Sequence, residues 1–258
     1  MENFKTTTFI VPSGAEYEIR EQNGEDEGVL SNQADAQKLM NITKFLAGII
    51  VHSSVTGGAC SVKQVLEIPL LDRYAIIFQS RIFSLGNTIE FEYNWGKLPN
   101  GNDDKVLYEQ DLHEFLFSDY SKVPTEEELD AKPDAIPYYP QMEGIKDLEF
   151  KTTSGKVVRW DYLDGNGEIY LMTLPADASN RNSTLVARNL RLLVDGNWEK
   201  VSNFSLFSVK DMAEIRKEIN AKDPTFLGTT TLTHPTDGNK VTQYPIMAAP
   251  TFFYLTEA

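Results

Sequence analysis

The chain has few of the residues that most often carry catalysis. Among 258 residues it has one cysteine, Cys60, and three histidines, His52, His113 and His234. A single cysteine excludes an intramolecular disulfide and fits a reducing compartment. The histidines lie far apart, and Cys60 has no histidine beside it to activate its thiol as a nucleophile. No Gly-x-Ser-x-Gly, Walker, His-Glu-x-x-His or dinucleotide-binding glycine pattern occurs. We therefore expect a protein that is not an enzyme and that holds no cofactor or metal.

Long apolar runs and an excess of positive charge are also missing. The longest apolar run lies around residues 45–51, well short of the roughly 20 residues of a membrane-spanning helix. Residues 1–5 lack the basic and apolar segments of a secretory signal. A formal net charge of -14 disfavours general affinity for phosphate backbones. We expect a soluble protein inside a cell that binds neither nucleic acid nor a membrane, and whose partners can carry basic patches.

One pattern occurs twice along the chain. Residues 9–20 and residues 148–160 each consist of two strand-like segments around a Ser-Gly turn. Each is followed by an acidic, glycine-containing segment, 23–27 or 164–168, which we expect to be a loop. One copy alone must bury its apolar face against something, so the repetition predicts two packed units. We expect an α+β fold of two repeated modules related by a pseudo-two-fold axis, each with an N-terminal β-hairpin, two helices and a second β-hairpin.

The spacing of apolar residues places the helices and the late hairpins. Helical spacing predicts helices over 32–50 and 69–83 in the first module and over 182–194 and 208–219 in the second. Ser208 is positioned as the N-cap of the last helix. The two late hairpins are predicted from strand-like pairs at 87–95 with 105–109 and at 227–233 with 240–246.

The segment between the copies is rich in proline and acidic residues. It predicts a linker over 118–146, which joins a first module, 1–117, to a second module, 147–258. Apolar groups in a linker or at a chain end must either pack within the chain or meet a partner. The residues of this kind, which are our candidates for partner binding, are Tyr138, Tyr139, Phe252, Phe253 and Tyr254.

Two further groups of residues are weaker candidates for chemistry. The acidic clusters at 25–27 and 103–104 lack the alternating oxygen ligands of a calcium loop, so we expect solvated turns there. The hairpin turns at 94–97 and 234–237 occupy the same place in each copy. A turn of this kind can carry a zinc knuckle, but one histidine with one aspartate is far from a tetrahedral site.

The order of motifs is the strongest functional signal. The first copy contains Pro12-Ser13-Gly14, then Gly24–Glu27, Leu70–Tyr74, Ser84–Gly86 and Ile89–Tyr93, and the second contains Thr184–Arg188, Val194–Gly196, Val209–Asp211, Ala213–Ile219 and Phe252-Phe253. This order resembles the T4-type phage baseplate hub assembly proteins, also described as tail assembly chaperones, over nearly the whole chain except the linker. Relatives place Cys-x-x-Cys at the hairpin turn, and this chain has Asn94-x-x-Lys97 and His234-x-x-Asp237 there.

The resemblance implies a non-enzymatic role in assembly of the baseplate or hub of a contractile phage or prophage tail. Its partners would be other phage tail or baseplate proteins, met in the host cytoplasm during assembly or within the virion. The first alternative is a permanent structural component of the virion baseplate. The second is a carbohydrate or host-surface binding protein, because Trp95, Trp160 and Trp198 could stack on sugars. An enzyme that uses the acidic clusters is the third, and it would need convergent titratable groups.

Overall fold

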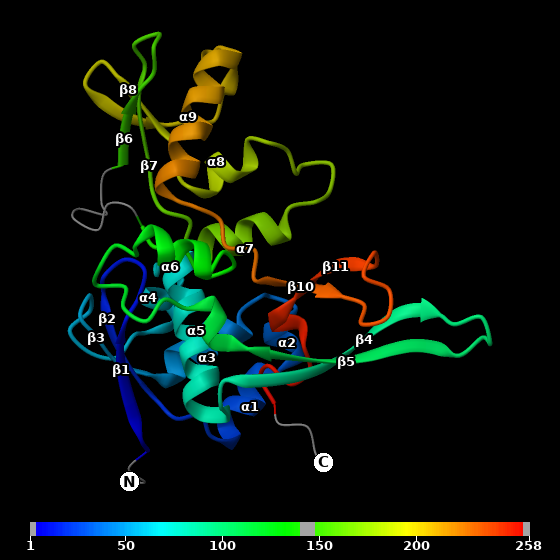
Figure 1. Cartoon of the computed structure of the whole chain (residues 1–258). Helices are drawn as coiled ribbons and strands as arrows, with labels where there is room; N and C mark the ends of the chain where they lie inside the picture. The colour runs from blue at the N-terminus through cyan, green and yellow to red at the C-terminus, as the bar shows by residue number, and fades with distance from the viewer. Residues whose placement is uncertain (1–3, 140–147, 255–258) are drawn as a thin grey trace.

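The structure, a computed structural model, describes residues 4–139 and 148–254. Figure 1 shows a first lobe, built mainly from the first half of the chain, and a second lobe above it. Within the described residues the strands form small antiparallel sheets that alternate with helices, which confirms the predicted α+β class. After α9 (Val209–Lys222) of the second lobe, the chain returns to the first lobe for the hairpin of β10 (Thr229–Thr233) and β11 (Val241–Pro245) and the segment that follows it.

The first lobe surrounds one long buried helix. This helix, α5, buries nine of its sixteen residues, and Ile76 and Phe78 are fully buried. Pro69 precedes it and Gly86, at a φ of 87°, ends it, close to the predicted range of 69–83. The bounds of α5 are Leu70–Leu85. Around it lie the sheet β1 (Thr6–Ile10), β2 (Glu16–Arg20) and β3 (Ile50–Ser53), and the helices α1 (Gly24–Leu30), α2 (Gln33–Ala36), α3 (Asn41–Ile49), α4 (Val62–Leu66), η1 (Leu112–Phe115) and α6 (Glu126–Ala131).

The second lobe is a four-stranded sheet with a helix against one face. Ser208 and Asp211 form a capping box that starts α9, which confirms the predicted N-cap. Met212, Ile215 and Ile219 of this helix are buried, as are Val158 and Trp160 on the facing side of the sheet. The elements are β6 (Leu148–Lys151), β7 (Val157–Trp160), α7 (Gly165–Thr173), α8 (Ser183–Ala187), β8 (Arg191–Val194), β9 (Asn197–Lys200), η2 (Phe204–Leu206) and α9 (Val209–Lys222).

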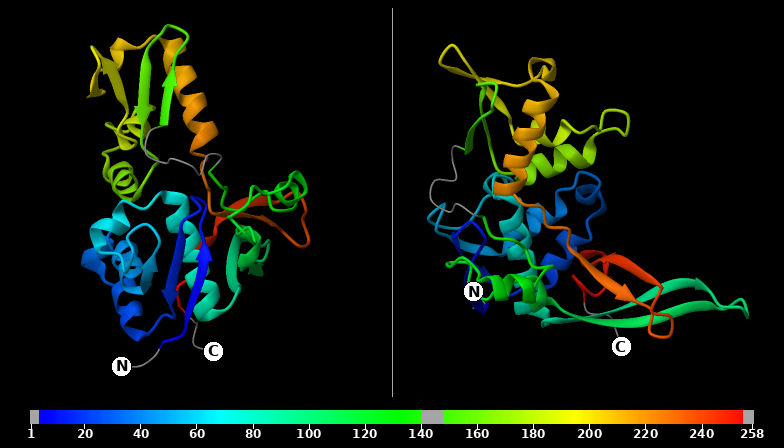
Figure 2. Two further views of the ribbon diagram at one scale, coloured as in Figure 1. Left: turned by 90° about the vertical axis from the view of Figure 1, so that its left-hand side faces the viewer. Right: turned by 45° about the horizontal axis from the view of Figure 1, so that its top comes forward.

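The two late hairpins pack on each other. The hairpin of β10 (Thr229–Thr233) and β11 (Val241–Pro245), followed by η3 (Ile246–Ala248), lies beside β4 (Thr88–Lys97) and β5 (Asp103–Asp111), which extend away from the lobes (Figures 1 and 2). The rings of Phe91 and Tyr244 stack 4.4 Å apart. The His234 ring meets Trp95 edge to face at 5.5 Å, and its Nε2 lies 3.2 Å from Asp104 Oδ1. The hairpin turns at 94–97 and 234–237 are therefore neighbours in space.

Two predicted helices are wrong in their extent, each because a residue with left-handed backbone ends the helix early. The predicted helix 32–50 contains Leu39 at a φ of 58°, and the chain forms α2, α3 and strand β3 instead. The predicted helix 182–194 ends after α8, because Asn189 has a φ of 48°. Residues 191–194 then pair with β7 as strand β8, although the spacing of their apolar residues also fits a helix.

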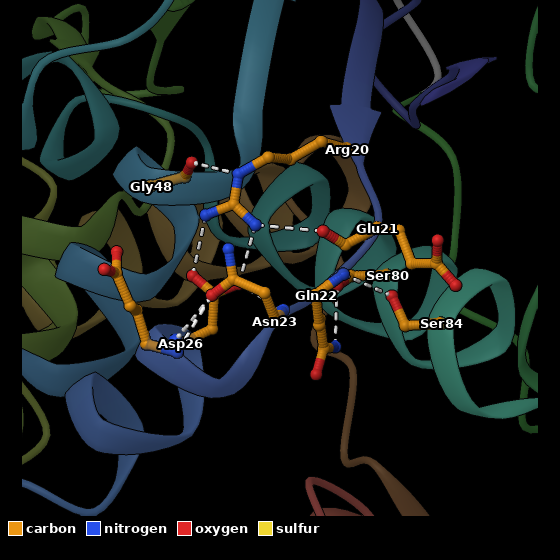
Figure 3. Close-up of polar contacts among 9 residues, drawn as sticks. Arg20, Glu21, Gln22, Asn23, Asp26, Gly48, Ser80 and Ser84 are labelled. Atoms are coloured by element: carbon orange, nitrogen blue, oxygen red, sulfur yellow. Dashed lines mark hydrogen bonds and ion pairs between the residues drawn. The ribbon is translucent and has the colours of Figure 1, made fainter. Parts of the chain in front are cut away.

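The predicted acidic loops begin helices. Asn23 and Asp164 are the N-caps of α1 and α7, and the acids that follow lie in the first turn, where the helix dipole favours negative charge. Asp26 also accepts two hydrogen bonds from Arg20, at 2.7 and 2.8 Å, and so ties α1 to β2. Figure 3 shows that the same turn reaches α5, because Gln22 donates to Ser80 and Ser84.

The described part of the predicted linker packs on the first lobe. Residues 118–139 include α6, and Tyr120, Ile136 and Tyr139 among them are buried. Ile136 N donates to Phe115 O at 2.9 Å. Residues 140–146 of the predicted linker lie outside the described residues. In the described part of the chain, no helix is both long enough and apolar enough to cross a membrane.

The Arg20–Asp26 ion pair gives a test of this packing. Asp26→Asn keeps the shape of the side chain but leaves the largely buried Arg20 guanidinium without its anion, so we expect the free energy of unfolding to fall by about 1 to 3 kcal/mol. Chemical denaturation measures the change. The matched control is Asp35→Asn, which removes the more exposed ion pair with Lys44 and should cost less than about 1 kcal/mol. Equal losses in the two variants would contradict the structural role of Asp26.

Candidate functional site: a groove between the lobes

The two lobes meet where the N-terminus of α7 approaches the start of α5. Leu70 N donates to Leu163 O across the junction at 2.7 Å. A Cβ atom on Gly165 would lie 2.8 Å from Arg73 Nη1, and one on Gly167 would lie 2.6 Å from Leu163 Cδ1. Both distances are too short for a side chain. Gly165 therefore permits close packing of the two lobes, and Gly167 permits close packing within the second lobe, because its neighbours are Leu163 and Ala187.

A buried ion pair forms the floor of the junction. The Arg73 side chain is 4% exposed, and it donates to Val65 O at 2.9 Å and to Thr43 Oγ1 at 3.1 Å. Glu168 of α7 lies 3.7 Å from Arg73 Nη2 and accepts from the Tyr74 hydroxyl at 3.3 Å. Burial lowers the pKa of Arg73 and raises that of Glu168, while the neighbouring opposite charge partly offsets both shifts. The polar groups here are directed at one another.

Above this floor lies an apolar groove of about 200 Å³ between α3, α5, α7, η3 and the C-terminal segment. Met172 is 63% exposed at its rim. Methionine side chains are flexible and adapt to irregular apolar surfaces. The volume is that of one or two large side chains rather than of a folded domain. The residues that give the groove its apolar character are Ile42, Ile77, Ile169, Met172, Met247 and Phe253.

The structure separates the five predicted partner-binding residues. Tyr139 and Phe252 are 1% and 0% exposed, so their side chains belong to the interior and present no surface to a partner. The Tyr139 ring packs 4.3 Å from that of Tyr162, and the Phe252 ring packs 5.2 Å from that of Phe78. Both rings pack in the interior of the protein, which is the usual place of aromatic side chains.

The other three candidates remain partly exposed. Phe253 is half-buried and lines the groove, with its ring 6.4 Å from that of Phe45. Tyr138 and Tyr254 are also half-buried but lie outside the groove lining. Sequence reasoning missed the groove methionines Met172 and Met247, because nothing in the local pattern distinguishes an exposed methionine from a buried one.

The acidic cluster at 103–104 and two of the tryptophans make contacts within the protein. Asp103 pairs with Lys97 at 2.5 Å, and Asp104 lies 3.2 Å from Lys240. Across residues 4–139 and 148–254, no three His, Cys, Asp or Glu side chains gather as metal ligands. Trp160 is buried in the second lobe, and Trp95 donates to the Tyr108 hydroxyl at 2.9 Å. None of the three histidines lines the groove.

No protein-family model, curated protein or solved structure matches this chain. The groove is therefore interpreted from its own geometry.

A second buried polar group lies in the first lobe near the junction. Asp72, in the first turn of α5, accepts from Ser13 N at 2.9 Å, which fixes the turn of the β1–β2 hairpin on α5. Its other oxygen has no hydrogen-bond partner among the described residues. Burial raises the pKa of Asp72 to about 7, although the bonds from Ser13 act in the opposite direction. The carboxyl group is thus held largely as the neutral acid below neutral pH.

This shift predicts how stability depends on pH. Because the folded-state pKa exceeds the unfolded one, the stabilisation from Asp72 is complete below the unfolded pKa and is lost as pH rises through the folded value. Asp72→Asn keeps the acceptor for Ser13 without the charge. Relative to this variant, the wild type should lose up to about 4 kcal/mol of unfolding free energy between about pH 4 and pH 7. Denaturation at several pH values measures it, and parallel pH profiles for both proteins would contradict the assignment.

Proposed function

We propose that the protein is a non-enzymatic assembly protein of a contractile phage or prophage tail, which binds an apolar segment of another tail or baseplate protein in the groove between its lobes. The groove is the observation that carries the proposal. Its lining is mostly apolar, its volume suits one or two large side chains, and the exposed Met172 gives it an adaptable rim. An apolar segment placed there would remove this surface from water.

The polar groups of the groove favour binding over chemistry. Arg73 already donates to Val65 and Thr43, and Glu168 is engaged by both Arg73 and Tyr74. A group that must accept or transfer a proton needs to face the substrate. Here the charged groups hold α5 and α7 together, so the surface that remains for a partner is apolar.

We further infer that the chain is an internal duplication with pseudo-two-fold symmetry, because equivalent positions make similar contacts. Ser13 bonds to Asp72, the third residue of α5, and Ser154 bonds to Asp211, the third residue of α9. A second hydrogen bond occurs at equivalent positions in each half of the chain. Gln22 N donates to Ser84 Oγ, and Leu163 N donates to Asp223 Oδ2.

The spacings support this equivalence. Gln22 and Leu163 each follow their turn serine by nine residues. Ser84 and Asp223 each follow their helix aspartate by twelve. The motifs that resemble the phage baseplate family are in part these contacts, since the Pro12-Ser13-Gly14 turn meets the Leu70–Tyr74 motif through Asp72. The resemblance therefore corresponds to a connected structural unit, and it supplies the phage context of the proposal.

A permanent component of the virion baseplate would use the same groove. Mass spectrometry of purified particles separates the two roles. An assembly factor should be absent or substoichiometric in mature particles, whereas a baseplate component should be present in a fixed ratio to the other baseplate proteins. Either result leaves the groove as the contact surface.

Substitution of Met172 tests the groove. A tagged chain should recover a tail or baseplate protein from phage-infected or prophage-induced cells. Met172→Glu places a charge at the apolar rim, so recovery should fall at least about tenfold. The control is Val209→Glu, because Val209 is 89% exposed on α9 and lies away from the groove. Equal recovery with Met172→Glu and wild type would contradict the groove, and recovery of no tail protein by the wild type would contradict the phage role.

A further inference from the structure

The sheet of the second lobe has one face that no described helix covers. Figure 2 shows α9 against one side of the sheet only. Strand pairing places Arg159 between Glu149 and Arg191, and Arg191 opposite Lys200, so these side chains share the uncovered face. Lys151 lies on the same face opposite Val157. Within the strands the face carries four basic side chains and one acidic one, Glu149, and Asp161, two residues beyond Arg159, pairs with Arg191.

This face also has an apolar centre. Leu193 is 37% exposed and pairs with Trp198 across β8 and β9. The Arg159 guanidinium lies over the Trp198 ring, 4.5 Å from its centroid. A stacked aromatic ring with a cation over it is the kind of group that anchors protein interfaces. We call this surface, formed by β6–β9 on the side away from α9, the basic sheet face.

The extended hairpin of β4 and β5 has a face of the opposite sign. Its inner side carries Phe91 and Tyr108 and packs on the last hairpin. On its outer side Glu90 stands directly opposite Glu109, and Glu92 stands opposite Leu107. Like charges directly opposite each other destabilise a strand pair. The outer side, which we call the acidic arm face, consists of Thr88, Glu90, Glu92, Asn94, Lys105, Leu107, Glu109 and Asp111, all of them exposed.

The acidic arm face carries an excess of charge opposite in sign to that of the basic sheet face. It has four acidic side chains and one basic one, Lys105, and it presents Leu107, which is 68% exposed, near its middle. The two lobes also differ in net charge. Residues 4–139 contain 22 acidic and 11 basic residues, a net charge of -11, whereas residues 148–223 contain 11 of each. The acidic excess of the chain therefore lies on the first lobe and its arm.

We propose that the acidic arm face of one copy docks on the basic sheet face of a second copy, so that the protein associates head to tail. Leu107 of one copy would meet Trp198 and Leu193 of the next, and the opposite charges around them would pair. The opposing glutamates Glu90 and Glu109 would then gain cationic partners. The high negative charge of the whole chain disfavours a nucleic acid as the occupant of the basic sheet face.

The geometry determines the kind of association. The two faces differ, so the contact is heterologous. An open oligomer keeps one free face of each kind at its ends, so it either extends as a filament or closes into a ring. With strands about 5 Å apart and about 3.3 Å per residue, the basic sheet face spans roughly 15 by 13 Å. A contact of this size is well below about 1,200 Å², so each one is weak and sensitive to salt. The inference is independent of the groove.

Charge reversal on each face tests the proposal by sedimentation velocity of the full chain. The wild type should associate at high protein concentration in low salt and dissociate as salt is added. One double variant, Lys151→Glu with Lys200→Glu, reverses the sheet face, and another, Glu90→Lys with Glu109→Lys, reverses the arm face. Each variant alone should be monomeric, because its two faces then carry the same sign. A mixture of the two should associate again, since each face now meets an opposite one in the other variant.

A control and a competing occupant complete the experiment. Lys210→Glu with Lys217→Glu changes the charge equally on α9, outside both faces, and should leave association intact. A wild type that stays monomeric in low salt, or a mixture that does not recover association, overturns the proposal. So does a monomeric wild type that binds single-stranded DNA and loses that binding in the sheet-face variant, which would make a nucleic acid the occupant.

Discussion

Most of the structure depends on the requirement that polar side chains of the buried helix α5 find partners. A polar group removed from water is costly unless it is hydrogen-bonded. Asp72 therefore fixes the first hairpin, and Arg73 connects to α4, α3 and the second lobe. Ser80 and Ser84 accept hydrogen bonds from Gln22, and Arg81 donates to the carbonyls of Gly86 and Thr88. A helix that was only apolar could slide or rotate within the core, whereas these bonds give each neighbouring element one position.

Local patterns in the sequence were sufficient for the elements with clear boundaries. Helix α9 has a serine cap and regular apolar spacing, and α5 lies between a proline and a glycine, so both were predicted nearly to their ends. The predictions failed where a single backbone torsion decided the result. Leu39 and Asn189 adopt positive φ values that no propensity assigns to them. Helix α3 and then strand β3 follow Leu39, and strand β8 follows Asn189. The acidic segments were mistaken for loops because capping residues and turn residues are chemically the same.

The candidate site was less accessible from the sequence, because it is made of contacts between distant segments. Phe253 was found as an apolar group near a chain end, and the structure places it in the groove lining. Tyr139 and Phe252 had the same signal but are buried, since composition cannot separate a side chain packed on its own chain from one that awaits a partner. Met172 had no signal at all. The charged faces of the second sheet and the arm were visible only after strand pairing had assigned each side chain to a side.

The return of the chain to the first lobe has a consequence for biosynthesis. Phe252 packs on Phe78, and Phe226 also touches that ring, so the aromatic centre of the first lobe is completed by residues that are translated after the second lobe. Domains usually fold in order as they emerge. Here the first lobe is complete only after the second lobe and the segment that follows it have been translated. Contacts this far apart in sequence slow folding, and a prematurely terminated product would expose unfilled apolar surface that proteases and chaperones recognise. The fold thereby makes folding of the first lobe depend on translation of the segment that follows the second lobe.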